Sequence, residues 1–143
     1  MREHWVHVEY DFNASPEKVF DHLAEHENLG PLFGAKVTRV KDGESARNGV
    51  GSARLLKVGP LPAFEETVTQ YSPNELIEYR ITHGSPLRNH VGIQRFTPLP
   101  GGGTHIDYRI RIASNIPGLA PIVKRVLTSG IVKGFSGLDG QLS

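Results

Sequence analysis

The stretch from Ile116 to Leu142 reads IPGLAPIVKRVLTSGIVKGFSGLDGQL, and it is the only long segment whose apolar residues recur with helical spacing. At about 100° per residue, one face of the helix carries Leu119, Val123, Val126 and Leu127. The same helical wheel places Gly130, Gly134 and Gly137 in the middle of this apolar stripe, where a core helix normally carries Leu or Ile. The stretch predicts a long C-terminal helix with a hollowed inner face.

The glycines require a physical reason, because each costs a helix interior roughly 1 kcal/mol relative to alanine. One interpretation is that Gly130 and Gly134 leave room for a ligand beneath the helix. The alternative is that glycine allows the helix backbone to lie close to a bulky residue of a sheet. Val132 and Phe135 fall on the polar side of the wheel, which favours either a helix break near Gly134 or a partner subunit, as in a homodimer.

The chain begins with a strand and a helix. Residues 6–12 alternate apolar and polar side chains, the period of a strand with one buried face. The run Ser15-Pro16-Glu17 then provides an N-cap, a proline at the first helical position and an acid in the first turn. These features predict a helix starting at Pro16, and a second, short helix is expected around 28–33.

Only strands and turns are expected from residue 35 to residue 113. The strands are expected over 35–41, 50–58, 63–71, 77–81, 89–97 and 106–112. Without an internal repeat or a long linker, residues 1–143 form one domain. A long antiparallel sheet curls, and its apolar concave face needs a cover that only the C-terminal helix is long enough to provide. The predicted class is α+β, with about seven strands curved around that helix.

The composition narrows the classes of function. The chain has 143 residues, a formal net charge of +1 and no cysteine, which excludes disulfides, thiolate metal sites and a cysteine nucleophile. Such a small net charge without a Lys/Arg run gives no electrostatic footprint for nucleic acid or an anionic membrane. The N-terminus lacks a signal-peptide core and no apolar run is long enough to span a bilayer. We therefore expect a soluble, cytoplasmic protein without stable membrane insertion.

Three segments resemble the START-like, or SRPBCC, superfamily, in particular its polyketide cyclase/dehydrase-like bacterial members. They are Ala14 to Phe20, Glu65 to Pro73, and the stretch from Arg95 through the glycines at 101–103 to Tyr108. The resemblance extends over nearly the whole chain. It implies a helix-grip (Bet v 1-like) fold, in which a curved sheet and the C-terminal helix enclose a mostly apolar cavity. The superfamily includes lipid carriers, hormone receptors, quinone-binding proteins and aromatase/cyclases, so the ligand remains open.

The register of the last hairpin decides which side chains face that cavity. A hairpin at 98–102 predicts the pairs Phe96 with Thr104, Gln94 with Ile106 and Gly92 with Tyr108. In this register His90, Gln94 and Tyr108 face the cavity, with His90 near Ile110. A one-residue slip would instead present Val91, Ile93 and Arg95.

The predicted ligand-binding residues come from the sheet and the helix. They are Tyr79, His90, Gln94, Tyr108, Leu119, Val123, Gly130 and Gly134. His90 and Tyr108 are also the candidates for acid/base catalysis, since a polar group in an apolar pocket can orient a ligand or exchange a proton with it. We expect Glu66 to face outward and Arg54 to be solvated, as charged residues are rarely buried.

No metal or cofactor is expected. The segment His22 to His26 satisfies the pattern H-x-x-E-H, which can hold zinc on a helix. However, no third ligand can be identified, and two histidines on a short helix are more simply a solvated flank. Glycine-rich nucleotide-binding loops and the G-x-S-x-G motif of hydrolases are absent from the sequence.

Three functions remain open. The first, and favoured, is binding of a hydrophobic or amphipathic small molecule of the lipid, polyketide, isoprenoid or quinone type. Its entrance is expected where residues 59–62, 83–89 and 115–119 meet at one end of the sheet. The second is an aromatic polyketide cyclase/dehydratase using His90 and Tyr108. The third is a protein–protein interaction module that docks through exposed Val132 and Phe135.

Overall fold

The computed structural model describes residues 1–143, in which three α-helices and seven strands follow one another along the chain. In chain order these are β1 (His4–Phe12), α1 (Pro16–Ala24), the 3₁₀ turn η1 (His26–Asn28), α2 (Gly30–Phe33), β2 (Lys36–Lys41), β3 (Ala53–Lys57), β4 (Phe64–Ser72), β5 (Leu76–His83), β6 (Leu87–Pro98), β7 (Thr104–Ser114) and α3 (Leu119–Leu142).

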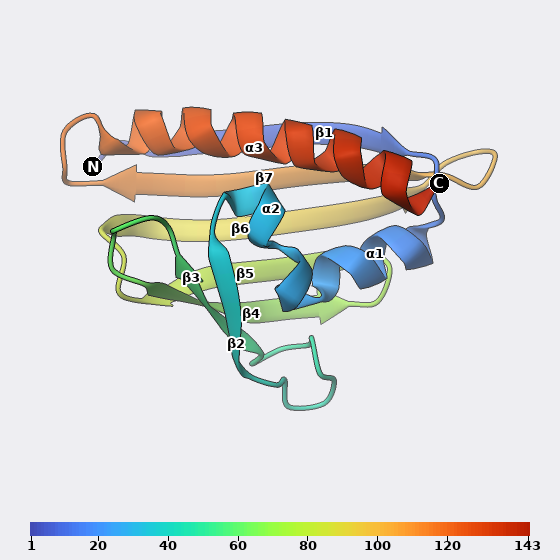
Figure 1. Ribbon diagram of the computed structural model, residues 1–143, viewed down its shortest axis with the longest axis horizontal. Helices are drawn as coiled ribbons and strands as arrows, with labels where there is room; N and C mark the ends of the chain where they lie inside the picture. Colours follow the sequence, from blue (N-terminus) through green and yellow to red (C-terminus); the bar gives the residue numbers. More distant parts are fainter.

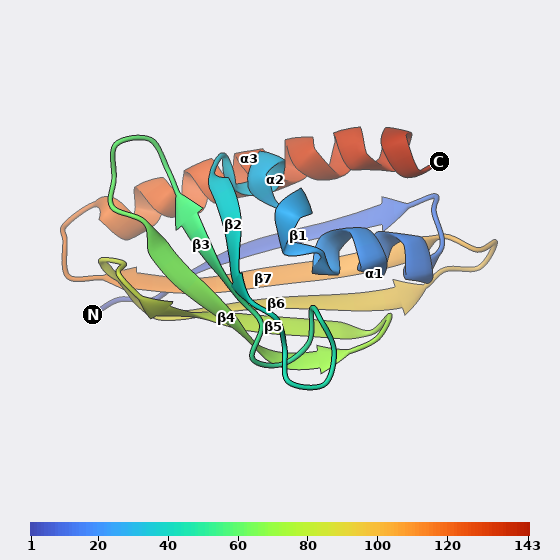
Figure 2. The same cartoon turned by 60° about the horizontal axis from the view of Figure 1, so that its bottom comes forward.

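The strands form one antiparallel sheet in the order β1-β7-β6-β5-β4-β3-β2, with β1 and β2 at the edges (Figure 1). The first strand therefore pairs with the last one, and α3 lies over these two strands. Figure 2 shows α1, α2 and α3 on the same side of the curved sheet. The predicted helix-grip fold is confirmed.

Local sequence accounts for α1. The Ser15 side chain accepts a hydrogen bond from the Lys18 backbone N–H at 3.3 Å, and Pro16 occupies the first turn. Such a cap satisfies one of the amide groups that a helix start leaves without a partner. The inner face buries Phe20, whose ring packs edge-on against Phe96 with centroids 5.1 Å apart.

The inner face of α3 differs from the prediction. Its buried side chains are Ala120, Ile131, Phe135 and Leu138. Phe135, which we expected on the polar side, is fully buried, and its ring lies 5.4 Å from that of Phe12. The helix is continuous through Gly134, so no break occurs there. The prediction was wrong because it took the first turns of the helix to define the buried face, whereas Val126 in those turns is 63% exposed.

The glycines of α3 face α2 and not an open space. A Cβ atom at Gly130 would lie 2.9 Å from the Leu32 carbonyl oxygen, and one at Gly134 would lie 3.0 Å from Leu32 Cδ2. Gly137 is exposed, with nothing within 4 Å of such an atom. Close packing of two helices therefore explains Gly130 and Gly134, and the partner is α2 and not a residue of the sheet.

The register of β6 and β7 is two residues away from the predicted one. The structure pairs Gly92 with Ile110, Gln94 with Tyr108 and Phe96 with Ile106. The shift arises because the hairpin loop is longer than expected, with Pro98 opposite Thr104. Since side chains alternate with a period of two, a shift of two residues leaves the same side chains facing inward. A β-bulge between Arg88 and Val91 then interrupts the pairing beside His90.

Candidate functional site

The concave side of the sheet buries a cluster of polar side chains, which we call the polar cluster. It consists of His26, Ser52, Arg54, Glu66, Tyr79, His90, Gln94 and Tyr108. These residues come from η1, from the segment before β3, and from β3 to β7. Burying polar groups is costly unless they are hydrogen-bonded, so the partners of each group decide what the cluster can do.

Arg54 and Glu66 form a buried ion pair at the centre of the polar cluster. They are directly opposite each other on β3 and β4, and their side chains are 3% and 6% exposed. Arg54 Nε and Nη2 lie 3.0 and 2.8 Å from Glu66 Oε1, and the guanidinium stacks 4.7 Å from the centre of the Tyr79 ring. The predictions of a solvated Arg54 and an outward Glu66 were therefore wrong, because each charge compensates the other.

Hydrogen bonds fix the tautomer of His26. Arg54 Nη1 donates to His26 Nδ1 at 3.1 Å, and a guanidinium can only donate. His26 Nε2 must therefore carry the proton, which it donates to Ser52 Oγ at 3.0 Å. Burial, followed by the positive charge of Arg54, lowers the pKa of His26 to about 3. Both ring nitrogens are engaged and the side chain is buried, so His26 is neither solvated nor available as a zinc ligand.

An arginine holds η1, and with it His26, over the sheet. Arg39 on β2 binds Glu25 and Glu27 at 2.9 and 3.0 Å. Hydrogen bonding from Arg39 lowers the pKa of Glu27 to about 2, so this carboxylate stays charged at neutral pH. The short η1 turn thus gains a fixed position that its own hydrogen bonds do not provide.

Two tyrosines form the floor of the polar cluster. The hydroxyls of Tyr79 and Tyr108 are hydrogen-bonded to each other, and both rings are buried. Burial raises the pKa of both phenols, so they stay protonated at neutral pH. Gly92 makes room for this arrangement, because a Cβ atom there would overlap the Tyr79 ring. Tyr79, and not Tyr108 as we expected, lies over Gly92.

Gln94 has an unpaired acceptor next to Tyr108 on the neighbouring strand. Its side chain is 2% exposed, and Oε1 is the buried side-chain atom that lacks a hydrogen-bond partner. Most buried polar atoms in proteins are paired, so an exception indicates a group that an additional molecule can satisfy.

His90 is oriented by the bulge of β6. Its Nδ1 accepts a hydrogen bond from the Ile81 backbone N–H at 3.0 Å, which places the proton of the neutral ring on Nε2. Nε2 lies 3.7 Å from Glu66 Oε2, and the ring lies 5.5 Å from that of Tyr79. Burial is the main cause that lowers the pKa of His90. At neutral pH His90 is therefore a donor and offers no free basic nitrogen.

Partly buried apolar side chains pack against the core that contains Tyr79 and Tyr108, and we call five of them the collar. They are Phe33, Val37, Leu87, Val123 and Leu127. The central carbon of the Arg54 guanidinium lies over the Phe33 ring, 6.0 Å from the centre of that ring. Leu119, which we also predicted to bind ligand, is partly exposed at the start of α3 near Val123.

The entrance was predicted at three connections of the chain. The connections 58–63, 84–86 and 115–118 all lie at the same end of the sheet, on the left in Figure 1. We call this region the loop end. The collar residue Leu87 directly follows the connection 84–86. The collar residue Val123 lies in α3, which begins after the connection 115–118.

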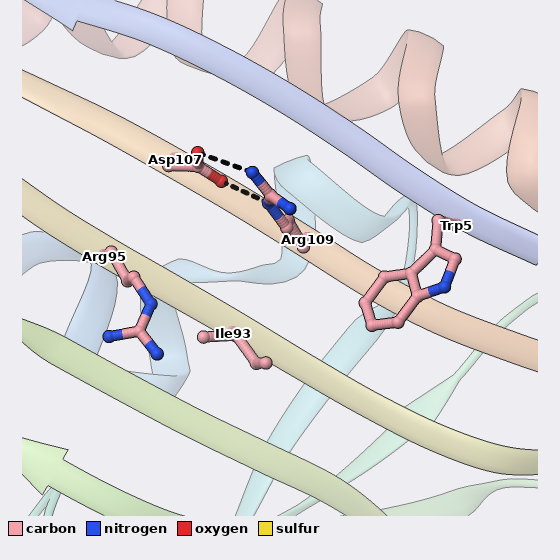
Figure 3. A pocket seen from close by; sticks show the side chains of 5 residues that line it. All are labelled: Trp5, Ile93, Arg95, Asp107 and Arg109. Carbon is pink, nitrogen blue, oxygen red and sulfur yellow. Dashed lines mark hydrogen bonds and ion pairs between the residues drawn. The ribbon is translucent and has the colours of Figure 1, made fainter.

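The other face of the sheet carries a separate depression. Figure 3 shows its lining of Trp5, Ile93, Arg95, Asp107 and Arg109, with Asp107 accepting hydrogen bonds from Arg109 at 3.0 and 3.3 Å. Ile93 and Arg95 are the residues that a one-residue slip would have placed inside. Their position excludes that alternative, and Gln94 faces inward between them.

The sequence matches the family described as polyketide cyclase / dehydrase and lipid transport over residues 3–142. The chain belongs to this family. No curated protein matches it significantly. None of the helices in this family member combines the length and the apolar character that a membrane span requires.

Solved structures of similar fold include several proteins of low sequence identity. A START superfamily protein from Mycobacterium smegmatis has a TM-score of 0.80 at 18% identity, covering 98% of this chain and 99% of that one. The Zhui aromatase/cyclase from Streptomyces sp. R1128 has a TM-score of 0.70 at 15% identity, with coverages of 99% and 92%. Norcoclaurine synthase from Thalictrum flavum, in complex with dopamine and hydroxybenzaldehyde, has a TM-score of 0.70 at 16% identity, covering 99% and 86%. At these identities the likeness establishes the fold alone.

The predicted site residues fall into three groups, one of which is the partly buried pair Leu119 and Val123 at the start of α3. The structure brings Tyr79, His90, Gln94 and Tyr108 together in the polar cluster. Gly130 and Gly134 lie against α2 instead. Sequence reasoning did not select His26, Ser52, Arg54 or Glu66, although the alternation of β4 already placed Glu66 on the same face as Val68.

Proposed function

We propose that this family member binds a largely apolar small molecule whose polar group is a hydrogen-bond donor. The observation that carries the proposal is the unpaired Gln94 Oε1 inside the polar cluster. A buried acceptor without a partner costs about 1–3 kcal/mol, which a ligand hydroxyl would recover. The apolar part of the ligand would contact the collar.

The remaining groups of the cluster favour a hydroxyl over an anion. Glu66 Oε2 lies 3.7 Å from His90 Nε2, which is too long for a hydrogen bond. This oxygen is therefore a second acceptor for a ligand donor. Arg54, the only cation in the cluster, is already engaged by Glu66 and His26. A hydroxylated polyketide, an isoprenoid alcohol or a quinol meets these requirements, whereas a carboxylate or phosphate would face Glu66 without a free cation.

Two probe molecules that differ by one hydroxyl test the proposal. We expect 1-naphthol to bind about tenfold or more tightly than 1-methoxynaphthalene, because only the naphthol can donate to Gln94. Gln94→Leu should remove this preference and leave the affinity for the methyl ether nearly unchanged. Gln70→Leu, an exposed position on β4, is the matched control. Calorimetric titration measures the six affinities, those of the native protein and of both variants for each probe. Equal affinity of the native protein for both probes would refute the donor requirement.

Identification of the natural ligand follows from the purified protein. Native mass spectrometry should detect a bound small molecule, and organic extraction should release it as an apolar compound with at least one hydroxyl. If the purified protein carries no small molecule and binds neither 1-naphthol nor 1-methoxynaphthalene, the binding function itself is contradicted.

The geometry favours binding over catalysis. For His90 to accept a proton at Nδ1, it would have to give up the hydrogen bond from Ile81, and burial lowers its pKa further. Tyr108 remains as a proton donor. The interaction module loses its main anchor, because Phe135 is fully buried.

A further inference from the structure

The net charge of +1 conceals an uneven distribution of charge. Asp107 is the only acidic residue between Glu78 and Asp139. The connections of the loop end contain no acidic residue, and neither do the first turns of α3. Of the acidic residues closest in the sequence, Glu3 pairs with Arg111, and Glu65 at the start of β4 accepts a hydrogen bond from Thr82.

Four exposed cations surround the loop end without an ionic partner. Lys57 and Arg88 lie in the strands that flank its connections, and Lys124 and Arg125 lie in the first two turns of α3. None of the four forms an ion pair. Elsewhere, six arginines each pair with a carboxylate: Arg39, Arg47, Arg54, Arg80, Arg109 and Arg111. The lysines outside this surface are also unpaired, so what distinguishes the loop end is that its connections lack acidic residues.

The same end exposes aliphatic side chains. Leu61 and Ile116 in two of the connections are 61% and 52% exposed, and Ile122 and Val126 on α3 are both 63% exposed. Ile122 and Val126 are four residues apart and therefore lie on one side of the helix. Each directly precedes a collar residue, Val123 or Leu127, so exposed and partly buried apolar side chains adjoin along this part of the helix.

We propose that the loop end and the first turns of α3 dock on an anionic lipid bilayer. Exposed aliphatic side chains enter the boundary between headgroups and acyl chains, and Lys or Arg beside them attract anionic lipids. A docked molecule would present its collar to the bilayer, so an apolar ligand would pass between them without crossing water.

The charge of this surface argues against other occupants. In a two-fold dimer the same patch meets itself, which would place cations opposite cations. Proteins that bind single-stranded nucleic acid combine cations with aromatic side chains for stacking, whereas the exposed apolar residues of this surface, Leu61, Ile116, Ile122 and Val126, are aliphatic.

Vesicle sedimentation tests the proposal on the protein as purified. We expect it to pellet with vesicles of phosphatidylcholine and phosphatidylglycerol in equal amounts, to bind pure phosphatidylcholine weakly, and to dissociate with added salt. Lys124→Glu combined with Arg125→Glu should weaken binding at least about tenfold. Lys18→Glu combined with Lys41→Glu changes the net charge equally at exposed positions away from the loop end, and should bind like the native protein.

Two further variants separate insertion from charge. Ile122→Ser with Val126→Ser should weaken pelleting, with little effect on folding since both side chains are exposed. Equal binding to both kinds of vesicle, or an equal loss in the control pair, would overturn the proposal. So would a dimer in sedimentation velocity that Val126→Asp dissociates. Because the assay needs no ligand, its outcome is independent of the naphthol titration.

Discussion

At the scale of single residues, the buried charges of the polar cluster explain both what the sequence predicts and what it misses. Arg54 and Glu66 lie on strands whose alternation points them inward, but burial statistics for single residues place each of them outside. The energy that permits their burial belongs to the pair. This stabilisation becomes visible only once β3 is known to pair with β4 in the register that places Arg54 opposite Glu66, and the sequence alone does not give that register.

Removing one member of this pair should be much worse than removing both. Arg54→Met leaves the Glu66 carboxylate buried without its cation, and we expect a loss of about 3–5 kcal/mol in the free energy of unfolding. Arg54→Met combined with Glu66→Leu should recover most of the loss. Urea denaturation measures the three values, and Arg80→Met, whose side chain is 47% exposed, should change stability little. A double variant no more stable than the single one would contradict this account.

His26 should make the protein sensitive to mild acid. Its pKa is lowered from 6.5 to about 3, so its contribution to stability is complete above pH 6.5 and is lost as the pH falls towards 3. His26→Gln keeps an acceptor for Arg54 and a donor for Ser52 but does not titrate. We expect the stability of this variant to fall less steeply in that range, by roughly 3–5 kcal/mol over the whole interval. Parallel slopes in denaturation at several pH values would exclude His26 as the source.

At the scale of elements, the inner face of α3 shows why a helical wheel can mislead. The wheel identifies apolar positions but not the side that the sheet covers. In the first half of α3 only Ala120 is buried, while Ile122 and Val126 are exposed. Ile131, Phe135 and Leu138 define the true core face, and they occur in the half of the helix where the glycines obscured the pattern.

Substitution of the glycines should separate helix packing from ligand space. Gly134→Leu would collide with Leu32 on α2, and we expect a loss of about 1–3 kcal/mol of stability. Gly137→Ala meets nothing within 4 Å and should stabilise the helix by up to about 1 kcal/mol. Thermal unfolding measures both changes. If Gly134→Leu kept full stability but lost ligand affinity, the glycine would border ligand space, as the sequence alone suggested.

At the scale of the whole molecule, the sheet was more predictable than its cover. Hydrophobic alternation identified the seven strands and the inward positions of Tyr79, Gln94 and Tyr108, because a period of two tolerates a register error of two residues. The packing of α2 against α3 was not predictable, since it depends on the Leu32 backbone lying close to Gly130. The polar cluster was found in part, through its members on β5, β6 and β7.

The uneven anchoring of α3 predicts how a ligand reaches the polar cluster. Ile131, Phe135 and Leu138 hold the second half of the helix, whereas Val123 and Leu127 in the first half are only partly buried. Local opening requires the least free energy where the fewest apolar contacts are lost. Amide hydrogens in residues 123–128 should therefore exchange faster with deuterium than those in 131–138, and 1-naphthol should slow the first group more. Exchange that is uniform along α3, and unchanged by a ligand that demonstrably binds, would mean that the ligand enters elsewhere.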